Sequence, residues 1–141
     1  MEKAWQRKRP YSKRVSNDRH IRNRILILCE GGKTEPNYFR KFPVNIDLVE
    51  VNVDGAGANT ISLVKDAIRI GQEAIERGHS YNQIWCVFDR DSFPAGNFNR
   101  AFNLAMRNRI RIAYSNQCFE LWYFLHYHFS DAAIDRYSYT Q

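Results

Sequence analysis

The chain of 141 residues is 44% hydrophobic, 26% charged and 14% aromatic, and its length is that of one domain. The apolar content excludes intrinsic disorder for most of the chain, and no stretch approaches the ~20 apolar residues of a membrane span. The N-terminus is basic but has no apolar block behind it, which excludes a secretory signal. We therefore expect a soluble, cytoplasmic protein without a membrane partner.

The chain has three cysteines, Cys29, Cys86 and Cys118. An odd number without short spacings is not typical of a disulfide scaffold or of a zinc site built from cysteines. All three lie in or beside apolar runs, so we expect them to be buried as small hydrophobic side chains.

The net charge of +6 is concentrated at the N-terminus. Residues 1–24 hold nine lysines and arginines against two acids, a balance of +7, whereas the other residues balance at −1. We expect residues 1–22 to be a basic flexible tail that binds the phosphate backbone of DNA or RNA; a tail that only improves solubility is the alternative. Trp5 and Tyr11 lie among the charges, where aromatic rings can stack on bases. The candidate nucleic-acid-binding residues of the tail are Arg7, Lys8, Arg9, Lys13 and Arg14.

Residues 23–141 are expected to form the folded domain, in which apolar and amphipathic segments alternate. Residues 24–30 form a continuous apolar run, which is typical of a strand buried on both faces. Residues 34–42 predict a helix with Thr34 as its N-cap. Residues 46–53 alternate more and predict an edge strand.

The rest of the chain continues this alternation. Residues 54–58 predict a turn, and Asn59 or Thr60 is expected to cap the amphipathic helix that follows. The remaining predicted elements are that helix over 60–77, a buried strand over 82–89, a helix near 97–108, a short strand over 111–115 and an apolar helix over 117–127. The alternation predicts an α/β fold in three layers, with a small, mainly parallel sheet of about four strands flanked by helices.

Acidic residues follow the first and third predicted strands. In open parallel sheets, ligands bind beyond the carboxyl ends of the strands at the point where strand order reverses. With a strand order 2-1-3-4, that point lies between Glu30 after the first strand and Asp89 and Asp91 after the third. Residues two apart in an extended segment point to the same side, so we expect these two aspartates to hold Mg²⁺ or Mn²⁺. Glu30 is expected to be a third ligand, or the general acid or base.

The segment Gly31–Thr34 matches the end of a phosphate-binding loop. The first glycine of that motif would fall at Ile27, inside the strand, which argues against such a loop. We expect the glycines to let the backbone turn tightly beside the metal site. Lys33 and Arg90 are candidates in the folded part for holding a substrate phosphate, and Arg40 is a further one that nothing in the sequence singles out.

Glu120 lies on the apolar helix predicted over 117–127. A carboxylate is costly to bury without a partner, so it either faces out beside Tyr123 or meets an arginine or the metal cluster. Because Ser115 and Asn116 place the start of this helix at a strand end, Glu120 is a further candidate catalytic residue. His126 and His128 are not expected to belong to the site.

Three stretches, residues 27–39, 88–91 and 115–122, resemble the RloB-like family, as does the basic tail. That family is similar to Toprim-type domains, in which a glutamate after the first strand and a D-x-D motif after the third carry Mg²⁺ chemistry on phosphodiesters. The resemblance implies that Glu30 is the acid–base group or a metal ligand, and that Asp89 and Asp91 are metal ligands.

The resemblance also implies a place in bacterial restriction-type defence and abortive infection, often with an ATPase partner encoded nearby. Members of the family continue beyond the end of this chain, so the domain is expected to lack a C-terminal strand or helix.

Three functions follow from these residues. The first is an Mg²⁺-dependent nuclease of phage defence, in which metal-bound oxygens stabilise an in-line displacement at phosphorus. The second is a non-catalytic module that binds nucleic acid or a protein partner through the tail. The third is phosphoryl transfer by an aspartate nucleophile, which ranks last because phosphatases place that nucleophile after the first strand, where this chain has Glu30.

Overall fold

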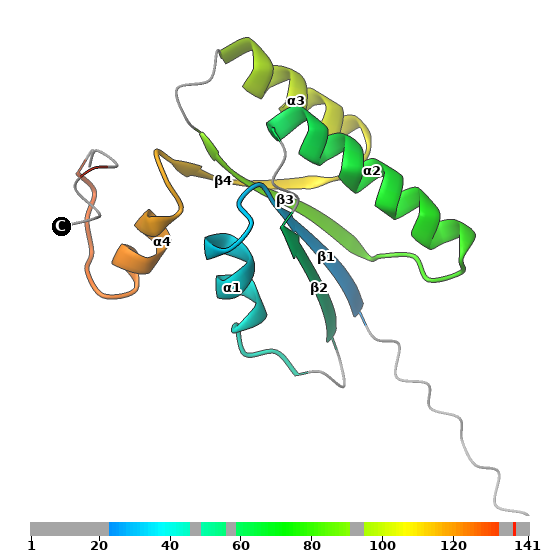
Figure 1. The fold of residues 1–141 in the computed structure, drawn as a ribbon, viewed down its shortest axis with the longest axis horizontal. Helices are drawn as coiled ribbons and strands as arrows, with labels where there is room; N and C mark the ends of the chain where they lie inside the picture. The colour runs from blue at the N-terminus through cyan, green and yellow to red at the C-terminus, as the bar shows by residue number, and fades with distance from the viewer. Residues whose placement is uncertain (1–22, 46–48, 56–58, 91–94, 133–136, 138–141) are drawn as a thin grey trace, which may run out of the picture.

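A computed structural model of the chain describes residues 23–45, 49–55, 59–90, 95–132 and 137 (Figure 1). Strands and helices alternate in the predicted order. The elements are β1 (Asn23–Cys29), α1 (Thr34–Arg40), β2 (Val49–Gly55), α2 (Thr60–Glu76), β3 (Gln83–Arg90), α3 (Ala95–Arg107), β4 (Arg111–Asn116) and α4 (Glu120–Leu125). The predicted tail, residues 1–22, lies outside the described residues.

The four strands form one parallel sheet with the order β2-β1-β3-β4. This is the 2-1-3-4 order on which the strand-end argument depends, with the reversal between β1 and β3, and it confirms that β2 is an edge strand. Register places Cys29 beside Val87, so the carboxyl ends of β1 and β3 lie next to each other. The register of β3 with β4 likewise pairs Asp89 with Ser115.

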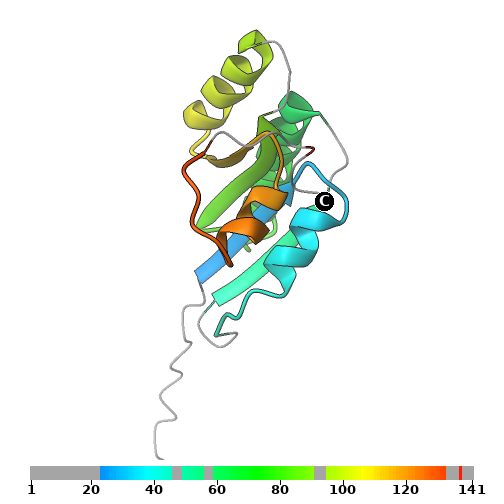
Figure 2. The same cartoon turned by 90° about the vertical axis from the view of Figure 1, so that its left-hand side faces the viewer.

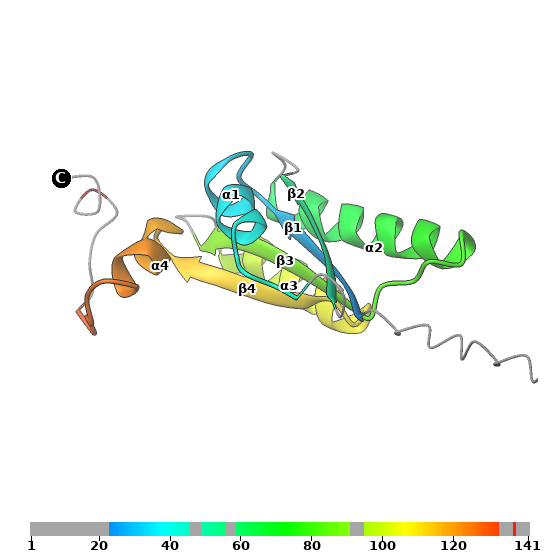
Figure 3. The same ribbon diagram turned by 90° about the horizontal axis from the view of Figure 1, so that it is seen from below.

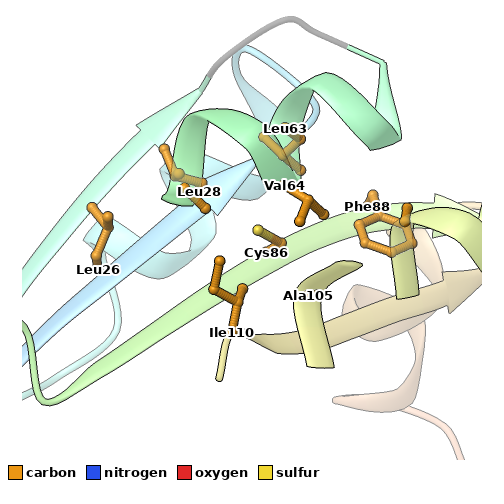
Figure 4. Close-up of a cluster of buried hydrophobic side chains, with 10 residues drawn as sticks. Leu26, Leu28, Leu63, Val64, Cys86, Phe88, Ala105 and Ile110 are labelled. Carbon is orange, nitrogen blue, oxygen red and sulfur yellow. The ribbon is translucent and has the colours of Figure 1, made fainter. Parts of the chain in front are cut away.

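Helices α2 and α3 cover one face of the sheet (Figures 1 and 4). Side chains at alternate positions of the central strands, such as Leu28 and Phe88, pack there against Leu63, Val64 and other apolar residues of the helices. Asn59 caps α2 as predicted, because its Oδ1 accepts a hydrogen bond from the Ser62 N–H at 3.0 Å.

Helices α1 and α4 cover the opposite face at the carboxyl end of the strands. Phe119 and the partly buried Tyr38 and Phe39 pack there on Cys29 and Val87. Figure 2 shows the two short helices side by side in front of the sheet, and Figure 3 shows α4 beyond the carboxyl end of β4. Helices therefore flank the sheet on both faces, which is a three-layer, Rossmann-like arrangement.

All three cysteines are buried, as predicted, and none is paired in a disulfide. Burial raises the pKa of both Cys29 and Cys86 to about 12. No helix in the described part of the chain is long and apolar enough to cross a membrane.

Three local predictions were wrong. Thr34 is the first residue of α1, not its cap: Lys33 precedes the helix without a side-chain capping bond, and its carbonyl accepts the Asn37 N–H at 3.0 Å. Gly55, predicted in a turn, still pairs with β1 and ends β2. Helix α4 begins at Glu120 and not at 117, because Gln117 has a positive φ of 72°, which no α-helix accommodates.

Candidate functional site at the carboxyl ends of β1 and β3

Glu30 extends the pairing of β1 with β3 by one residue. Its backbone N–H donates to the Val87 carbonyl at 2.9 Å. Its carboxylate then turns to the end of β3, where Oε2 accepts the backbone N–H of Asp89 at 3.4 Å. The structure thus brings Glu30 and Asp89 together, as the strand-end argument predicted.

The other carboxylate oxygen of Glu30 faces the start of α2. The Thr60 hydroxyl, on the first residue of this helix, donates to Oε1 of Glu30 at 3.5 Å. Thr60 is buried, and Glu30 is half-buried. The positive end of a 17-residue helix dipole therefore lies beside the carboxylate, where it stabilises negative charge. Two elements hold the Glu30 side chain in one orientation.

Cys118 and Glu120 approach the same end of the sheet from the side of β4. The pKa of Cys118 is raised by burial first, then by its hydrogen bond with Glu120, and further by the negative charges of Glu120 and Asp89. Glu120 is half-buried at the start of α4. Glu120 is thus close to the Cys118 thiol, and the negative charge of Asp89 also acts on that thiol.

Ser115 is the position of β4 level with Asp89. It is only 3% exposed, and its hydroxyl oxygen has no hydrogen-bonding partner among the described residues. A buried hydroxyl without a partner is costly and is found where a water, an ion or a ligand completes its bonding. Ser115 therefore marks a polar position beside the aspartate.

A cavity of about 410 Å³ opens next to Thr60, between the starts of α2 and α3. The exposed Arg90 contributes to it, with its guanidinium carbon 5.2 Å from the ring centroid of Phe98. Among the described residues, its lining is Asn59, Thr60, Ile61, Arg90, Ala95, Asn97 and Phe98. A cation over an aromatic ring at the rim of a cavity is well placed to receive a phosphate.

The turn after Glu30 is tightly packed at Gly31, whereas Gly32, the second glycine predicted to be needed there, has no close neighbour among the described residues. A Cβ on Gly31 would collide with the buried carboxylate of Glu35. A Cβ on Gly55 would lie 2.8 Å from the Gly31 carbonyl oxygen and 3.0 Å from the Gly32 Cα. The end of β2 therefore supports the turn that carries Glu30, and the exposed Lys33 follows directly.

The described residues include no group of three His, Cys, Asp or Glu side chains gathered as a metal site. Asp91, the predicted second aspartate, lies outside the described residues, as do the five basic residues of the tail. The Glu30 carboxylate reaches the backbone N–H of Asp89, so these two acids lie at neighbouring strand ends, with Ser115 level with Asp89. Mg²⁺ is commonly held by one or two carboxylates, with water and substrate phosphate as the other ligands. The donor set fits this ion.

Sequence reasoning missed Thr60 and Ser115 as members of the site. Both lie at the same edge of the sheet as the acids, one at the start of the helix after β2 and the other at the end of β4. The rule that located Glu30 and Asp89 would have found them if it had been applied to hydroxyl groups as well as to carboxylates.

Comparisons with known proteins give one result. No curated protein and no solved structure matches the chain. The family model described as RloB-like protein matches residues 25–141, well over half of the sequence. This match begins within β1 and includes Glu30, Asp89 and Glu120. The chain belongs to the RloB-like protein family.

Proposed function

We propose that the protein is an Mg²⁺-dependent nuclease that hydrolyses phosphodiester bonds in DNA or RNA, with Mn²⁺ as an alternative ion. The observation that carries this proposal is the hydrogen bond from the Asp89 backbone N–H to the Glu30 carboxylate, because it shows that two acidic residues from distant parts of the sequence occupy neighbouring strand ends. The positive formal charge of the chain suits a polyanionic substrate.

In this proposal the ion is held by Asp89 and Asp91, with Glu30 beside them. When bound, it would polarise the scissile phosphate and lower the pKa of a bound water. Glu30 is held by Thr60 and the Asp89 N–H, so it is oriented to take the proton from the attacking water. The new bond forms between the water oxygen and phosphorus, and the P–O bond to the leaving oxygen breaks as that oxygen takes a proton from solvent water, while Glu30 later returns its proton to solvent.

The remaining residues hold the substrate. Arg90 lies at the rim of the adjoining cavity, and Lys33 lies in the turn after Glu30; both provide cations for non-reacting phosphate oxygens. Glu120, beside Cys118, is assigned to the polar edge of the site. The resemblance noted from the sequence supports phage defence as the setting, with a separately encoded ATPase as a partner.

A second function, binding of nucleic acid without cleavage, is favoured by the +7 balance of residues 1–24. This function needs the basic tail and not the acids at the strand ends. If this function is correct, the affinity for nucleic acid should fall as salt is added and should not change when Asp89 is replaced.

The experiment is to incubate end-labelled single- and double-stranded DNA and RNA with the protein in Mg²⁺ or Mn²⁺. We expect cleavage that stops in EDTA and falls on the order of 100-fold in Asp89→Asn. Asp66→Asn is the matched control, since Asp66 lies on α2 beside Arg69, at 3.5 Å, and outside the site. Cleavage by Asp89→Asn at the wild-type rate would overturn the site; salt-sensitive binding without any cleavage would favour the second function.

A further inference from the structure

A second cavity, of about 380 Å³, lies between α1 and α4, the two helices that stand side by side in Figure 2. Aromatic residues dominate its walls. The lining residues are Asn37, Tyr38, Lys41, Phe42, Pro43, Tyr123 and His126. We call this cavity the aromatic groove. None of these residues lines the cavity beside Thr60, so the groove is a separate feature.

Tyr38 organises the rings of the groove. Its ring lies edge-on to Tyr123 with 5.5 Å between centroids, and tilted against Phe42 and His126 at 6.2 and 5.7 Å. Its hydroxyl is hydrogen-bonded to Nε2 of His126 at 2.9 Å. These contacts fix the ring orientations before any ligand binds, which lowers the entropic cost of binding.

Two rings of the groove remain accessible. Phe42 is 54% exposed and Tyr123 is 37% exposed. Exposed aromatic side chains that meet at a cavity can accept another flat ring by stacking, and a cavity of this volume is within the usual range for a small ligand.

The charges of the lining residues indicate which kind of flat ring the groove binds. Lys41 and His126 line the groove, and no carboxylate is among the lining residues in the described part of the chain. Asn37 adds an amide that can bond to the edge of a base. We propose that the aromatic groove binds an unpaired nucleobase of a single-stranded nucleic acid, with the following phosphate paired to Lys41.

The groove is connected to the strand-end site by α1 and α4. The Tyr123 hydroxyl donates to the carbonyl of Thr34 at 3.4 Å, and Thr34 follows the turn that leads from Glu30. Tyr123 is also near Glu120, because the two residues are three positions apart on α4 and therefore lie on the same side of the helix. In this proposal, a strand anchored in the groove continues past Tyr123 and Thr34 towards the acids. The inference rests on the proposed nuclease function and names its substrate class, since the bases of a duplex are stacked and paired.

Other exposed apolar side chains lie on and after α4, namely Trp122, Leu125, Tyr127 and Phe129. A surface of this kind also suits a protein contact. The groove differs from it by its lysine, its amide and its hydrogen-bonded Tyr38–His126 pair. These polar side chains favour binding of a base with its phosphate over binding of an apolar segment of a protein.

The test measures binding of fluorescent oligonucleotides of about twelve nucleotides to the full chain in EDTA, so that cleavage plays no part. Phe42→Ala should weaken binding of the single strand about tenfold, because one stacking partner is lost. Phe42→Leu, which keeps an apolar side chain of similar size, should weaken it as well. Phe102→Ala is the control, because Phe102 is 38% exposed on α3 at the other face of the sheet. The affinity for a duplex should be the same for Phe42→Ala, Phe42→Leu and Phe102→Ala.

Photocrosslinking supplies a second readout with an oligonucleotide that carries 5-iodouracil. We expect the crosslink in the peptides that contain residues 37–43 or 120–126. Crosslinks confined to other peptides would overturn the inference, as would equal affinity of Phe42→Ala, Phe42→Leu and Phe102→Ala. If Phe42→Ala alters the sedimentation coefficient of the protein alone and leaves oligonucleotide binding unchanged, the groove is a contact between protein chains and the inference is wrong.

Failure of this inference can be told from failure of the nuclease proposal. Groove-dependent binding in EDTA by a protein that never cleaves in Mg²⁺ contradicts the nuclease alone. Cleavage that requires Asp89, with oligonucleotide binding indifferent to Phe42, contradicts the groove alone.

Discussion

The Oε2 atom of Glu30 accepts a hydrogen bond from the backbone N–H of Asp89 at 3.4 Å. The two residues are 59 positions apart; Glu30 directly follows β1, and Asp89 is the last residue but one of the adjacent parallel strand β3. This bond gives the Glu30 carboxylate a structural role in addition to the chemical role that we propose, and the two roles can be separated by substitution.

Glu30→Gln tests the chemical role. A glutamine keeps one oxygen, which can accept the Asp89 N–H, and its amide N–H can donate to the Thr60 hydroxyl, but it cannot take a proton from water. We expect the unfolding free energy to stay within about 1 kcal/mol of wild type, and the cleavage rate to fall on the order of 100-fold or more. Urea denaturation and a gel-based cleavage assay measure the two quantities.

Glu30→Ala is the companion variant. It removes the acceptor of both the Asp89 N–H and the Thr60 hydroxyl, so we expect a loss of about 1–3 kcal/mol in unfolding free energy. Equal stability of the alanine and glutamine variants would show that the hydrogen bonds of Glu30 do not support the strand ends.

Gly55→Ala tests the support that β2 gives to the catalytic turn. The new Cβ would approach the Gly31 carbonyl and the Gly32 Cα, which are backbone atoms and cannot rotate away. We expect a loss of about 1–3 kcal/mol in unfolding free energy and slower cleavage, because the turn that carries Glu30 must shift.

The matched control for Gly55→Ala is Gly32→Ala. A Cβ at Gly32 has no neighbour within 4 Å among the described residues, and the turn is the same one. It should leave the melting temperature unchanged or raise it slightly. If both variants lose stability equally, the close approach of Gly55 to the turn is not what requires a glycine.

Ser115→Ala is expected to separate stability from activity. The hydroxyl is buried, and no partner for it is found in the described part of the chain, so its removal should raise the unfolding free energy by about 1 kcal/mol. If the hydroxyl orders water or substrate beside Asp89, cleavage should fall by about tenfold at the same time. Thermal unfolding and cleavage are measured on the same samples, with Ser80→Ala, at an exposed position, as the control. Lower stability in Ser115→Ala would contradict the first part.

The order of the strands and the meeting of Glu30 with Asp89 could be predicted from the sequence. The continuous apolar runs of β1 and β3 identify central strands, the more alternating β2 identifies an edge, and parallel strands necessarily gather their carboxyl ends at one side. The position of a residue at the carboxyl end of a buried strand in the fold can therefore be inferred from the position of that strand.

The contacts that depend on how helices pack could not be predicted in the same way. The Thr60–Glu30 bond requires the start of α2 to lie over the end of β1, and the Tyr38–His126 bond joins residues 88 positions apart on two short helices. His126 was not expected in a site because nothing in its local sequence indicates its partner. The start of α4 was placed too early because the positive φ of Gln117 has no signature in the apolar pattern.

The buried thiols predict a loss of stability at high pH. The pKa of Cys29 and of Cys86 is raised from 9.0 to about 12 in the folded protein, with burial as the main cause. Above pH 9 the unfolded chain releases these protons while the folded chain retains them, so the unfolding free energy should fall as pH rises from 9 towards 12. The stabilisation is fully present below pH 9.

Urea denaturation at a series of pH values checks this prediction, and Cys86→Ala should show a shallower decline. As an independent readout, the thiols should react slowly with a maleimide in the folded protein at pH 8 and rapidly in urea, since the thiolate is the reactive form. A pH profile that is identical in wild type and Cys86→Ala would contradict the assignment.

The last prediction concerns the basic tail, residues 1–22, and separates substrate binding from catalysis. Replacement of five cations by glutamine should reduce the slope of log affinity against log salt by about 3.5 for a single strand. The cleavage rate at saturating substrate should not change, because the strand-end acids are untouched. The five residues are Arg7, Lys8, Arg9, Lys13 and Arg14.

A control variant with the same change in net charge keeps the comparison fair. It carries glutamine at five exposed cations of α2, its C-cap and α3, namely Lys65, Arg69, Arg77, Arg100 and Arg107. If the salt slope drops equally in both variants, nucleic acid responds to net charge and not to the tail. If only the tail variant loses slope and its saturated cleavage rate falls as well, the tail also positions the substrate at Glu30 and Asp89, because a purely electrostatic anchor alters affinity and leaves the rate of the bound complex unchanged.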